Sequence, residues 1–255
     1  MIDTHSHIYL KDFDADREEM MQRAEEAGLE KIYLPNIDSS SIENLKNLAN
    51  TDARCIPMMG LHPGSVKEDF EKELEQILNE LKSETNYYKA VGEIGIDLYW
   101  DKTFIEAQKY CFTKQIEVAK ELKLPIVIHC REAFDEVFEV LEANADDRLF
   151  GIFHCFTGNL EQGQRAVNLG LKLGIGGVVT FKNAGLDKVV EQLSLKDLVL
   201  ETDAPYLSPV PFRGKRNEPS YIRHTAQKIA DLHQIPLKEL QAICTKNSLE
   251  IFKDE

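Results

Sequence analysis

The chain has 255 residues, of which 43% are hydrophobic, a length and composition that suit one large globular domain or two small ones. Its formal net charge of −14 at pH 7 argues against a protein that binds nucleic acid through an extended cationic surface. Five cysteines without a Cys-x-x-Cys pair argue against a disulfide framework. Because the chain has no apolar segment of membrane-spanning length and no signal-like N-terminus, we expect a cytoplasmic protein.

Apolar runs rich in β-branched residues alternate with amphipathic stretches from the first residues onward. In chain order, the periodicity predicts a strand over 2–7, a helix over 14–27, a strand over 31–37, a helix over 39–50, a strand over 55–61, a helix over 66–82, a strand over 89–95 and a helix over 104–122. Asp14 is predicted to be the N-cap of the first helix, and Gly28 to end it.

The same alternation continues in the second half of the chain. It predicts a strand over 126–129, a helix over 133–142, a strand over 150–154, a helix over 160–169, a strand over 172–176, a weaker helix over 186–193, a strand over 198–203 and helices over 221–233 and 237–252. Eight strands, each followed by a helix, predict an α/β fold, a TIM-type (β/α)8 barrel with extra C-terminal helices. We expect a single domain over residues 1–255. A doubly wound open sheet is the alternative, but it does not require eight strands.

The active sites of such barrels lie at the C-terminal ends of the strands. Reading only these ends collects five of the seven histidines together with two carboxylates, namely His5, His7, His62, Glu93, His129, His154 and Asp203. On a strand over 2–7, the period of two sends His5 and His7 to the same side. Each of these residues alone is weak support for a metal site, but random placement would rarely gather them all.

The metal-ligating residues are too many for one ion, because four imidazoles and two carboxylates exceed a tetrahedral coordination sphere. We therefore expect two divalent ions, about 3.5–4 Å apart, with a hydroxide between them as the nucleophile. One ion would be bound by His5, His7 and Asp203, and the other by His129 and His154. Zn, Mg, Mn, Ni and Co all accept such ligands, so the identity of the metal stays open.

Several acidic and imidazole groups are expected to assist this site. Glu93 would bridge the two ions, and Asp203 would position the nucleophile or take its proton. Glu201 lies two residues before Asp203, so its side chain would point to the same side of the strand, one layer deeper in the barrel. There it would hold the ring of a ligand histidine in place. The alternative is that Glu201 is a buried acid paired with a Lys. Asp97 would steer a ligand or cap the next helix. His62 would orient substrate or be a hydrogen-bonded loop residue.

Three cations lie within four residues after the last predicted strand of this acidic chain. They are Arg213, Lys215 and Arg216, and Asn217 follows them. The planar fork of Arg suits phosphate oxygens, and the loops after strands 7 and 8 of these barrels often bind phosphate. Two metal ions beside a phosphate-binding loop predict hydrolysis of a phosphate ester, although the loop can also be a simple solvated charged segment.

Six motifs at these positions resemble those of one known family. They are IDTHSH at 2–7, GLHP at 60–63, GEIGID at 92–97, FHCFTG at 153–158, ETDAPY at 201–206 and RGKRNEP at 213–219. Together they are similar to the TatD family of metal-dependent deoxyribonucleases, which belongs to the amidohydrolase-like metallohydrolase barrels. The sequence departs from the family pattern at Ser6, Gly64 and Leu98, none of which is a ligand, although Leu98 stands where an aromatic residue is common.

The resemblance implies a barrel with a two-metal site whose ligands are His5, His7, Glu93, His129, His154 and Asp203. It also implies hydrolysis of DNA, with 3′–5′ exonuclease or repair-type activity. We expect single strands or 3′ ends of DNA as the substrate and no membrane association; the oligomeric state stays open, with a monomer favoured. One alternative is a small-molecule amidohydrolase or phosphoesterase, whose metals are often bridged by a carboxylated Lys; here Glu93 stands at that position. The other is a non-catalytic, metal-stabilised binding protein, which would need fewer ligands.

Overall fold

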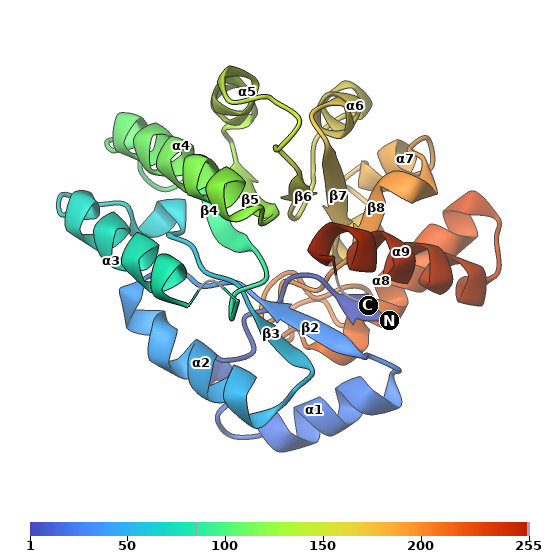
Figure 1. Cartoon of the computed structure of the whole chain (residues 1–255). Coiled ribbons are helices and arrows are strands. Elements are labelled where there is room, and N and C mark those ends of the chain that lie inside the picture. The colour runs from blue at the N-terminus through green and yellow to red at the C-terminus, as the bar shows by residue number, and fades with distance from the viewer. Residues whose placement is uncertain (85, 254–255) are drawn as a thin grey trace.

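The computed structural model describes residues 1–84 and 86–253. Its parallel strands lie at the centre of the molecule with helices around them (Figure 1). The strands are β1 (Ile2–Asp3), β2 (Lys31–Leu34), β3 (Cys55–Pro57), β4 (Val91–Asp97), β5 (Ile126–Arg131), β6 (Gly151–Phe153), β7 (Leu171–Ile175) and β8 (Leu198–Leu200). They pair in sequence order, as one run from β1 to β3 and another from β4 to β8.

Backbone hydrogen bonds join these two runs at both of their edges. Between β3 and β4, the N–H of Gly92 donates to the carbonyl of Met59 at 3.0 Å. Between β8 and β1, the N–H of Thr4 donates to the carbonyl of Leu200 at 3.0 Å. The strands therefore close on themselves, and the predicted (β/α)8 barrel is confirmed.

The helices follow one another around the strands in chain order, clockwise in Figure 1 from α1 at the bottom to α8 at the right. They are α1 (Arg17–Glu26), α2 (Ile42–Thr51), α3 (Phe70–Ser83), α4 (Ile105–Leu122), α5 (Phe134–Ala143), α6 (Leu160–Asn168), α7 (Leu186–Val190), α8 (Ile222–His233) and α9 (Leu237–Phe252). Each turns an apolar stripe inward; in α3 this stripe buries Leu74, Ile77 and Leu81. In the part of the chain described, no helix is both long and apolar enough to cross a membrane.

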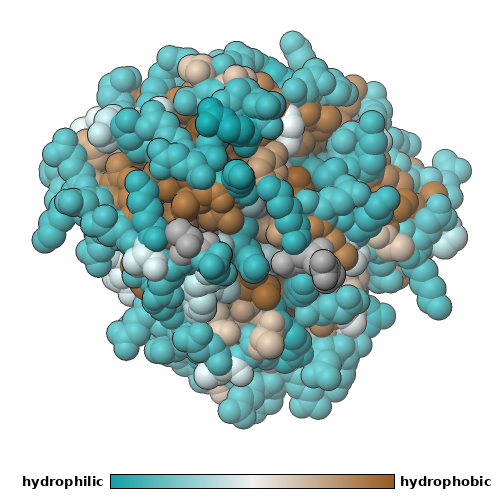
Figure 2. All heavy atoms as spheres, in the orientation of Figure 1, coloured by the Kyte–Doolittle hydropathy of each residue, from teal (hydrophilic) through white to brown (hydrophobic). Residues whose placement is uncertain are grey.

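Helix α9 covers the end of the barrel at which the strands begin. Side chains from the strands, or from residues next to them, form a cluster with the end of this helix, consisting of Ile2, Tyr33, Met58, Ala90, Val127, Ile152, Val199, Ile251 and Phe252. The rings of Tyr33 and Phe252 are stacked, with centroids 3.5 Å apart. In Figure 2, which keeps the orientation of Figure 1, hydrophilic side chains cover much of the surface, with hydrophobic patches between them. The candidate functional residues lie at the opposite end of the barrel, where the strands end.

Six strands (β1, β2, β3, β6, β7 and β8) end earlier than the sequence predicts, and among them β1 and β8 lead into candidate ligands. β1 stops at Asp3 instead of residue 7, and β8 stops at Leu200 instead of residue 203. Beyond these points the two segments bond to each other, since the N–H of Asp203 donates to the carbonyl of His5 at 2.9 Å. Asp203 itself adopts a left-handed conformation, with φ of 56°. Irregular backbone, and not a continued strand, therefore orients these side chains.

Candidate metal centre

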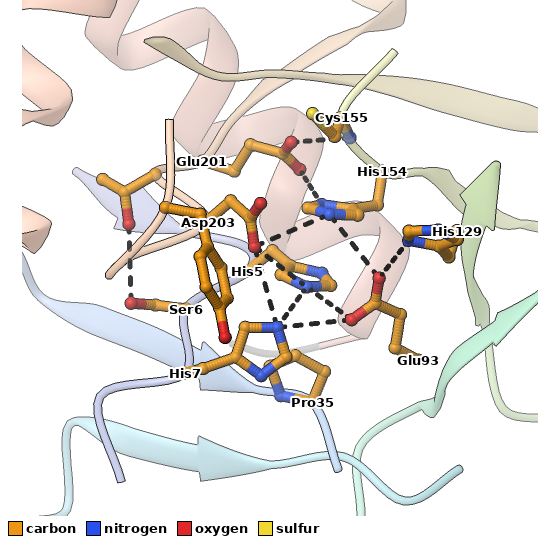
Figure 3. Close-up of polar contacts among 12 residues, drawn as sticks. His5, Ser6, His7, Pro35, Glu93, His129, His154, Cys155, Glu201 and Asp203 are labelled. Carbon is orange, nitrogen blue, oxygen red and sulfur yellow. Dashed lines mark hydrogen bonds and ion pairs between the residues drawn. The ribbon is translucent and has the colours of Figure 1, made fainter. Parts of the chain in front are cut away.

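Glu93 in β4 is buried, and its two carboxylate oxygens face different groups of imidazoles (Figure 3). Oε2 lies 3.1 Å from Nε2 of His5 and 3.3 Å from Nε2 of His7. These two Nε2 atoms are 3.2 Å apart. Although β1 ends before them, His5 and His7 thus meet in one place, as the spacing of the two histidines predicts.

The other oxygen of Glu93 faces a second group of three imidazoles. Oε1 lies 2.9 Å from Nδ1 of His129, 3.6 Å from Nε2 of His62 and 3.7 Å from Nε2 of His154. His62 also accepts a hydrogen bond at Nδ1 from the N–H of Gly64, at 2.9 Å. His62, to which the sequence assigned either a substrate or a loop role, therefore lies in the same cluster as the other histidines.

Asp203 closes this cluster from the segment after β8. Its Oδ1 lies 3.6 Å from Nε2 of His7, and 3.8 Å from Nε2 of both His5 and His154. The rings of His5 and His154 are stacked, with centroids 3.3 Å apart. The structure thus brings together all the imidazoles and carboxylates that the strand ends predict as ligands.

Two carboxylates behind the histidines hold their rings in place. Glu201 is fully buried; its Oε1 accepts the N–H of Cys155 at 2.7 Å, and its Oε2 lies 3.1 Å from Nδ1 of His154 (Figure 3). Of the two readings of Glu201, the structure therefore matches the one in which it fixes a histidine. Asp97 does the same for another ring, because its Oδ2 lies 2.9 Å from Nε2 of His129.

Two residues that the sequence reasoning missed support the first two histidines. Asp3 is fully buried and accepts hydrogen bonds from the N–H of His5 at 3.2 Å and from the hydroxyl of Thr202 at 2.5 Å. Burial raises the pKa of Asp3 to about 8. The hydroxyl of Tyr9 lies 3.1 Å from Nδ1 of His7 and donates to a backbone carbonyl. An acid within an apolar strand, two residues before a histidine, is the signal that would have found Asp3.

The protonation of the cluster depends on burial and on the facing charges. Burial acts to raise the pKa of Glu93, but the imidazoles around it, His5 and His62 foremost, outweigh burial and hold this pKa well below its ordinary value. Burial and the neighbouring His154 hold the pKa of His5 well below its ordinary value. Burial raises the pKa of Asp203 to about 6. The lowered pKa of His5 favours its neutral imidazole, which is the form that binds a metal ion.

This donor set fits divalent metal ions. Neutral imidazole and carboxylate are the ligands that Zn, Mn and related ions accept, and Nδ1 of His5 is buried without a hydrogen-bond partner among the described residues. Among the described residues, ligand atoms lie within 4.8 Å of one another in four sets that share members, His5–His7–Glu93, His5–His154–Asp203, His62–Glu93–His129 and His154–Cys155–Glu201. Burial acts to lower the pKa of His129, but Asp97 and Glu93 outweigh burial and raise this pKa to about 9, so a metal ion here competes with a proton.

Two of the four residues expected to bind phosphate have other partners in the structure. Both Nη atoms of Arg216 bind the carboxylate of Asp16, at 2.7 Å each. Asn217 is fully buried, and its amide donates to the carbonyls of Thr202 at 2.7 Å and Tyr206 at 2.6 Å. These two assignments are corrected: Arg216 and Asn217 fasten the loop to α1 and to the segment after β8.

The other two cations of this loop remain available to solvent. Arg213 and Lys215 are both exposed. The guanidinium of Arg213 lies over the ring of Phe181, 3.7 Å from its centroid, and also donates to the carbonyl of Ser208. The predicted anion-binding loop is therefore reduced to these two side chains.

The sequence and the fold are both similar to those of known proteins. The family described as TatD related DNase matches residues 2–253. An uncharacterized metal-dependent hydrolase of Bacillus subtilis (strain 168), YabD, is 37% identical over 254 residues, which cover 99% of each chain. The crystal structure of YjjV, a TatD homolog from Escherichia coli K12, matches with a TM-score of 0.94 at 32% identity, covering 100% of this chain and 98% of that one. A TatD family hydrolase from Entamoeba histolytica shares the fold, with a TM-score of 0.87 at 22% identity and coverage of 98% and 97%.

Proposed function

The chain belongs to the TatD family of metal-dependent hydrolases, and we propose that it hydrolyses phosphodiester bonds of DNA with two divalent metal ions. The observation that carries this proposal is the buried carboxylate of Glu93, whose oxygens face separate groups of imidazoles at one end of the barrel. The family description, TatD related DNase, supports DNA as the substrate. The exposed cations Arg213 and Lys215, on the loop after β8, favour a phosphate.

In this proposal His5, His7 and Asp203 would hold one ion, and His129 and His154 would hold the other. Glu93 could serve both groups, because Oε2 faces His5 and His7 and Oε1 faces His129. Bound divalent ions supply positive charge that activates a water molecule and offsets the charge on the phosphate oxygens. The donor set accepts Zn, Mg, Mn, Ni or Co.

The protein's own groups orient the reactants and accept the proton. Asp203 and Glu93 are the catalytic residues of this proposal. With a pKa of about 6, Asp203 is mostly ionised at neutral pH and is therefore able to accept a proton from an attacking water. Glu201 and Asp97 fix the rings of His154 and His129, and Arg213 and Lys215 bind the phosphate chain. An acidic chain holds few phosphates at once, which favours single strands or 3′ ends over long duplexes.

The test is degradation of a 5′-labelled single-stranded oligonucleotide, with and without EDTA and with added Mg or Mn. We expect a metal-dependent ladder that shortens from the 3′ end. Asp203→Asn should lower the rate about 100- to 10,000-fold, as expected when a general base is lost. Asp231→Asn, on the exposed side of α8, is the matched control and should be fully active.

Circular dichroism and thermal unfolding show whether the variants keep the fold. A fully active Asp203→Asn enzyme would contradict the role of this carboxylate, and equal degradation in EDTA would contradict metal dependence. If no metal supports cleavage of DNA, small phosphate esters and cyclic amides become the substrates to examine on the same barrel.

A further inference from the structure

Two large aromatic side chains stand exposed just after β4, outside the cluster of candidate ligands. Trp100 is the only tryptophan of the sequence and is 79% exposed, and Tyr99 is 46% exposed. Their rings meet edge to face, with centroids 4.7 Å apart. Leu98, one of the departures from the family pattern, is buried, so it is Tyr99 and Trp100 that reach solvent here.

Arg131, the last residue of β5, completes this aromatic surface. Its guanidinium carbon lies 3.7 Å from the ring centroid of Tyr99 and 5.5 Å from that of Trp100. Within residues 1–84 and 86–253, no carboxylate pairs with this guanidinium, and the side chain is exposed. A flat cation that rests on an aromatic ring and lacks a counter-ion is therefore presented to solvent.

This surface is connected directly to the candidate metal centre. Asp97 and Arg131 are paired in the register of β4 and β5, and the N–H of Leu98 donates to the carbonyl of Arg131 at 2.9 Å. One oxygen of Asp97 accepts the N–H of Tyr99 at 3.0 Å, and the other lies 2.9 Å from His129. The aromatic surface and the second imidazole group are thus held by the same carboxylate.

We propose that Tyr99, Trp100 and Arg131 form a stacking platform for a nucleobase of single-stranded DNA, adjacent to the phosphate that is cleaved; this inference rests on the proposed function. Aromatic faces and guanidinium planes stack on any unpaired base, whatever the sequence. In a chain with a net charge of −14, a free arginine at this position also favours the polyanion. A base inside a duplex has no free face, so the platform selects unpaired strands.

Kinetics with matched oligonucleotides test the platform. Stacking is worth about 1–3 kcal/mol per base, so Trp100→Ala should lower kcat/KM on single-stranded DNA by about 5- to 150-fold. It should change nothing on an oligonucleotide with an abasic residue beside the cleaved linkage. Trp100→Phe should retain most of the activity. Tyr110→Ala is the matched control, because Tyr110 is 49% exposed but lies on α4 against Phe70.

Fluorescence gives a second readout that does not need cleavage. Trp100 is the only indole, so its emission reports on the platform alone. We expect a saturable change in emission when the metal-loaded wild-type enzyme binds a phosphorothioate-linked oligonucleotide, and none with the abasic version.

The two readouts separate failure of this inference from failure of the proposed function. Unchanged emission and unchanged Trp100→Ala kinetics, in an enzyme that degrades DNA, overturn the platform and leave the nuclease standing. Absence of DNA degradation with any metal overturns the proposed function. The base-dependent emission change then decides by itself whether the platform binds a base. An emission change that depends on protein concentration alone would assign the surface to contact between two copies of the chain, and would overturn the inference.

Discussion

Gly174 in β7 leaves the space that the carboxylate of Glu201 fills. A Cβ added at Gly174 would lie 2.1 Å from Oε2 of Glu201, the same oxygen that lies 3.1 Å from Nδ1 of His154. Glu201 is fully buried, so the carboxylate has no solvent-filled space into which to move. The absence of a side chain at Gly174 therefore determines, through Glu201, the orientation of the ring of His154.

Gly174→Ala should displace Glu201 and lower metal affinity about 10- to 100-fold, as loss of the carboxylate that orients a ligand histidine does. Glu201→Gln should have a similar effect. Gly176→Ala is the matched control, since its Cβ would lie 3.7 Å from the nearest atoms of Glu201, an ordinary contact. Calorimetric titration with Zn or Mn measures the affinities, and wild-type affinity in Gly174→Ala would show that Glu201 does not hold His154.

At the scale of single residues, the ligand cluster could be predicted from the sequence because its members lie at or just after the ends of strands. A buried strand fixes which way its last residues point, so His129 after an apolar run needs no further information. The role of Arg216 was predicted wrongly because its partner, Asp16, lies 200 positions away in the chain. No residue near Arg216 in the sequence indicates this pairing. Arg131 was missed for a related reason, since an arginine after a histidine reads as an ordinary charged residue until the rings of Tyr99 and Trp100 are placed beside it.

Among the elements, the loop after β8 is tied to the start of α1 by charge. Asp16, the residue before α1, accepts two hydrogen bonds from Arg216 and one from Arg23. Arg23 in turn binds Glu218 of the same loop, at 2.7 Å. Hydrogen bonds from Arg216, with help from Arg23, hold the pKa of Asp16 at about 2. This network fixes the loop that carries Arg213 and Lys215.

Asp16→Asn should lower the free energy of unfolding at pH 7 by about 1–2 kcal/mol, because hydrogen bonds to a charged partner are weakened. The folded-state pKa lies below the ordinary value of 3.8, so the stabilisation is complete above that pH and is lost as pH falls towards about 2. Urea unfolding at pH 7, 5 and 3 should therefore show a difference between wild type and variant that narrows at pH 3.

Asp14→Asn provides the control for this measurement. Asp14 is 60% exposed and pairs with Arg17, so its replacement should cost less than about 0.5 kcal/mol. A difference between wild type and Asp16→Asn that stayed constant from pH 7 to pH 3 would contradict the stated role of the carboxylate.

The order of the elements could be predicted well from the sequence, and their lengths less well. Alternating apolar runs and amphipathic stretches indicate which faces of the chain are buried. For this reason each predicted strand and helix has a counterpart in the structure. Strand length depends on which segment lies alongside: after Asp3 the backbone bonds to the segment beyond β8, so the ladder stops early. The helix predicted over 186–193 is shorter in the structure, where α7 covers Leu186–Val190.

On the scale of the whole molecule, an acidic protein is proposed to bind a polyanion. The net charge of −14 repels DNA at a distance, so attraction has to come from metal ions and a few local cations. Arg213 and Lys215 are the exposed cations of the loop beside the site. Their contribution should appear in the dependence of binding on salt.

Replacing both Arg213 and Lys215 with Ala should reduce the slope of log affinity against log salt by about 1.4, at about 0.7 per contacted phosphate of a single strand. Fluorescence anisotropy with the metal-loaded Asp203→Asn enzyme, which should degrade the probe only slowly, measures the slope. Replacing Lys238 and Lys246 on α9, at the other end of the barrel, should leave it unchanged. An equal slope in both double variants would show that the loop does not contact the phosphate chain.

The closure of the barrel also bears on how the protein is made. Thr4 and Leu200, whose backbones join the first and last strands, lie 196 positions apart in the chain. During synthesis the free edge of β1 therefore waits, unpaired, until β8 has left the ribosome. Tyr33 lacks its stacking partner for longer still, because that partner is Phe252. For most of its translation the nascent chain can therefore form incorrect strand pairings. The packing of the barrel is complete only when α9 has left the ribosome.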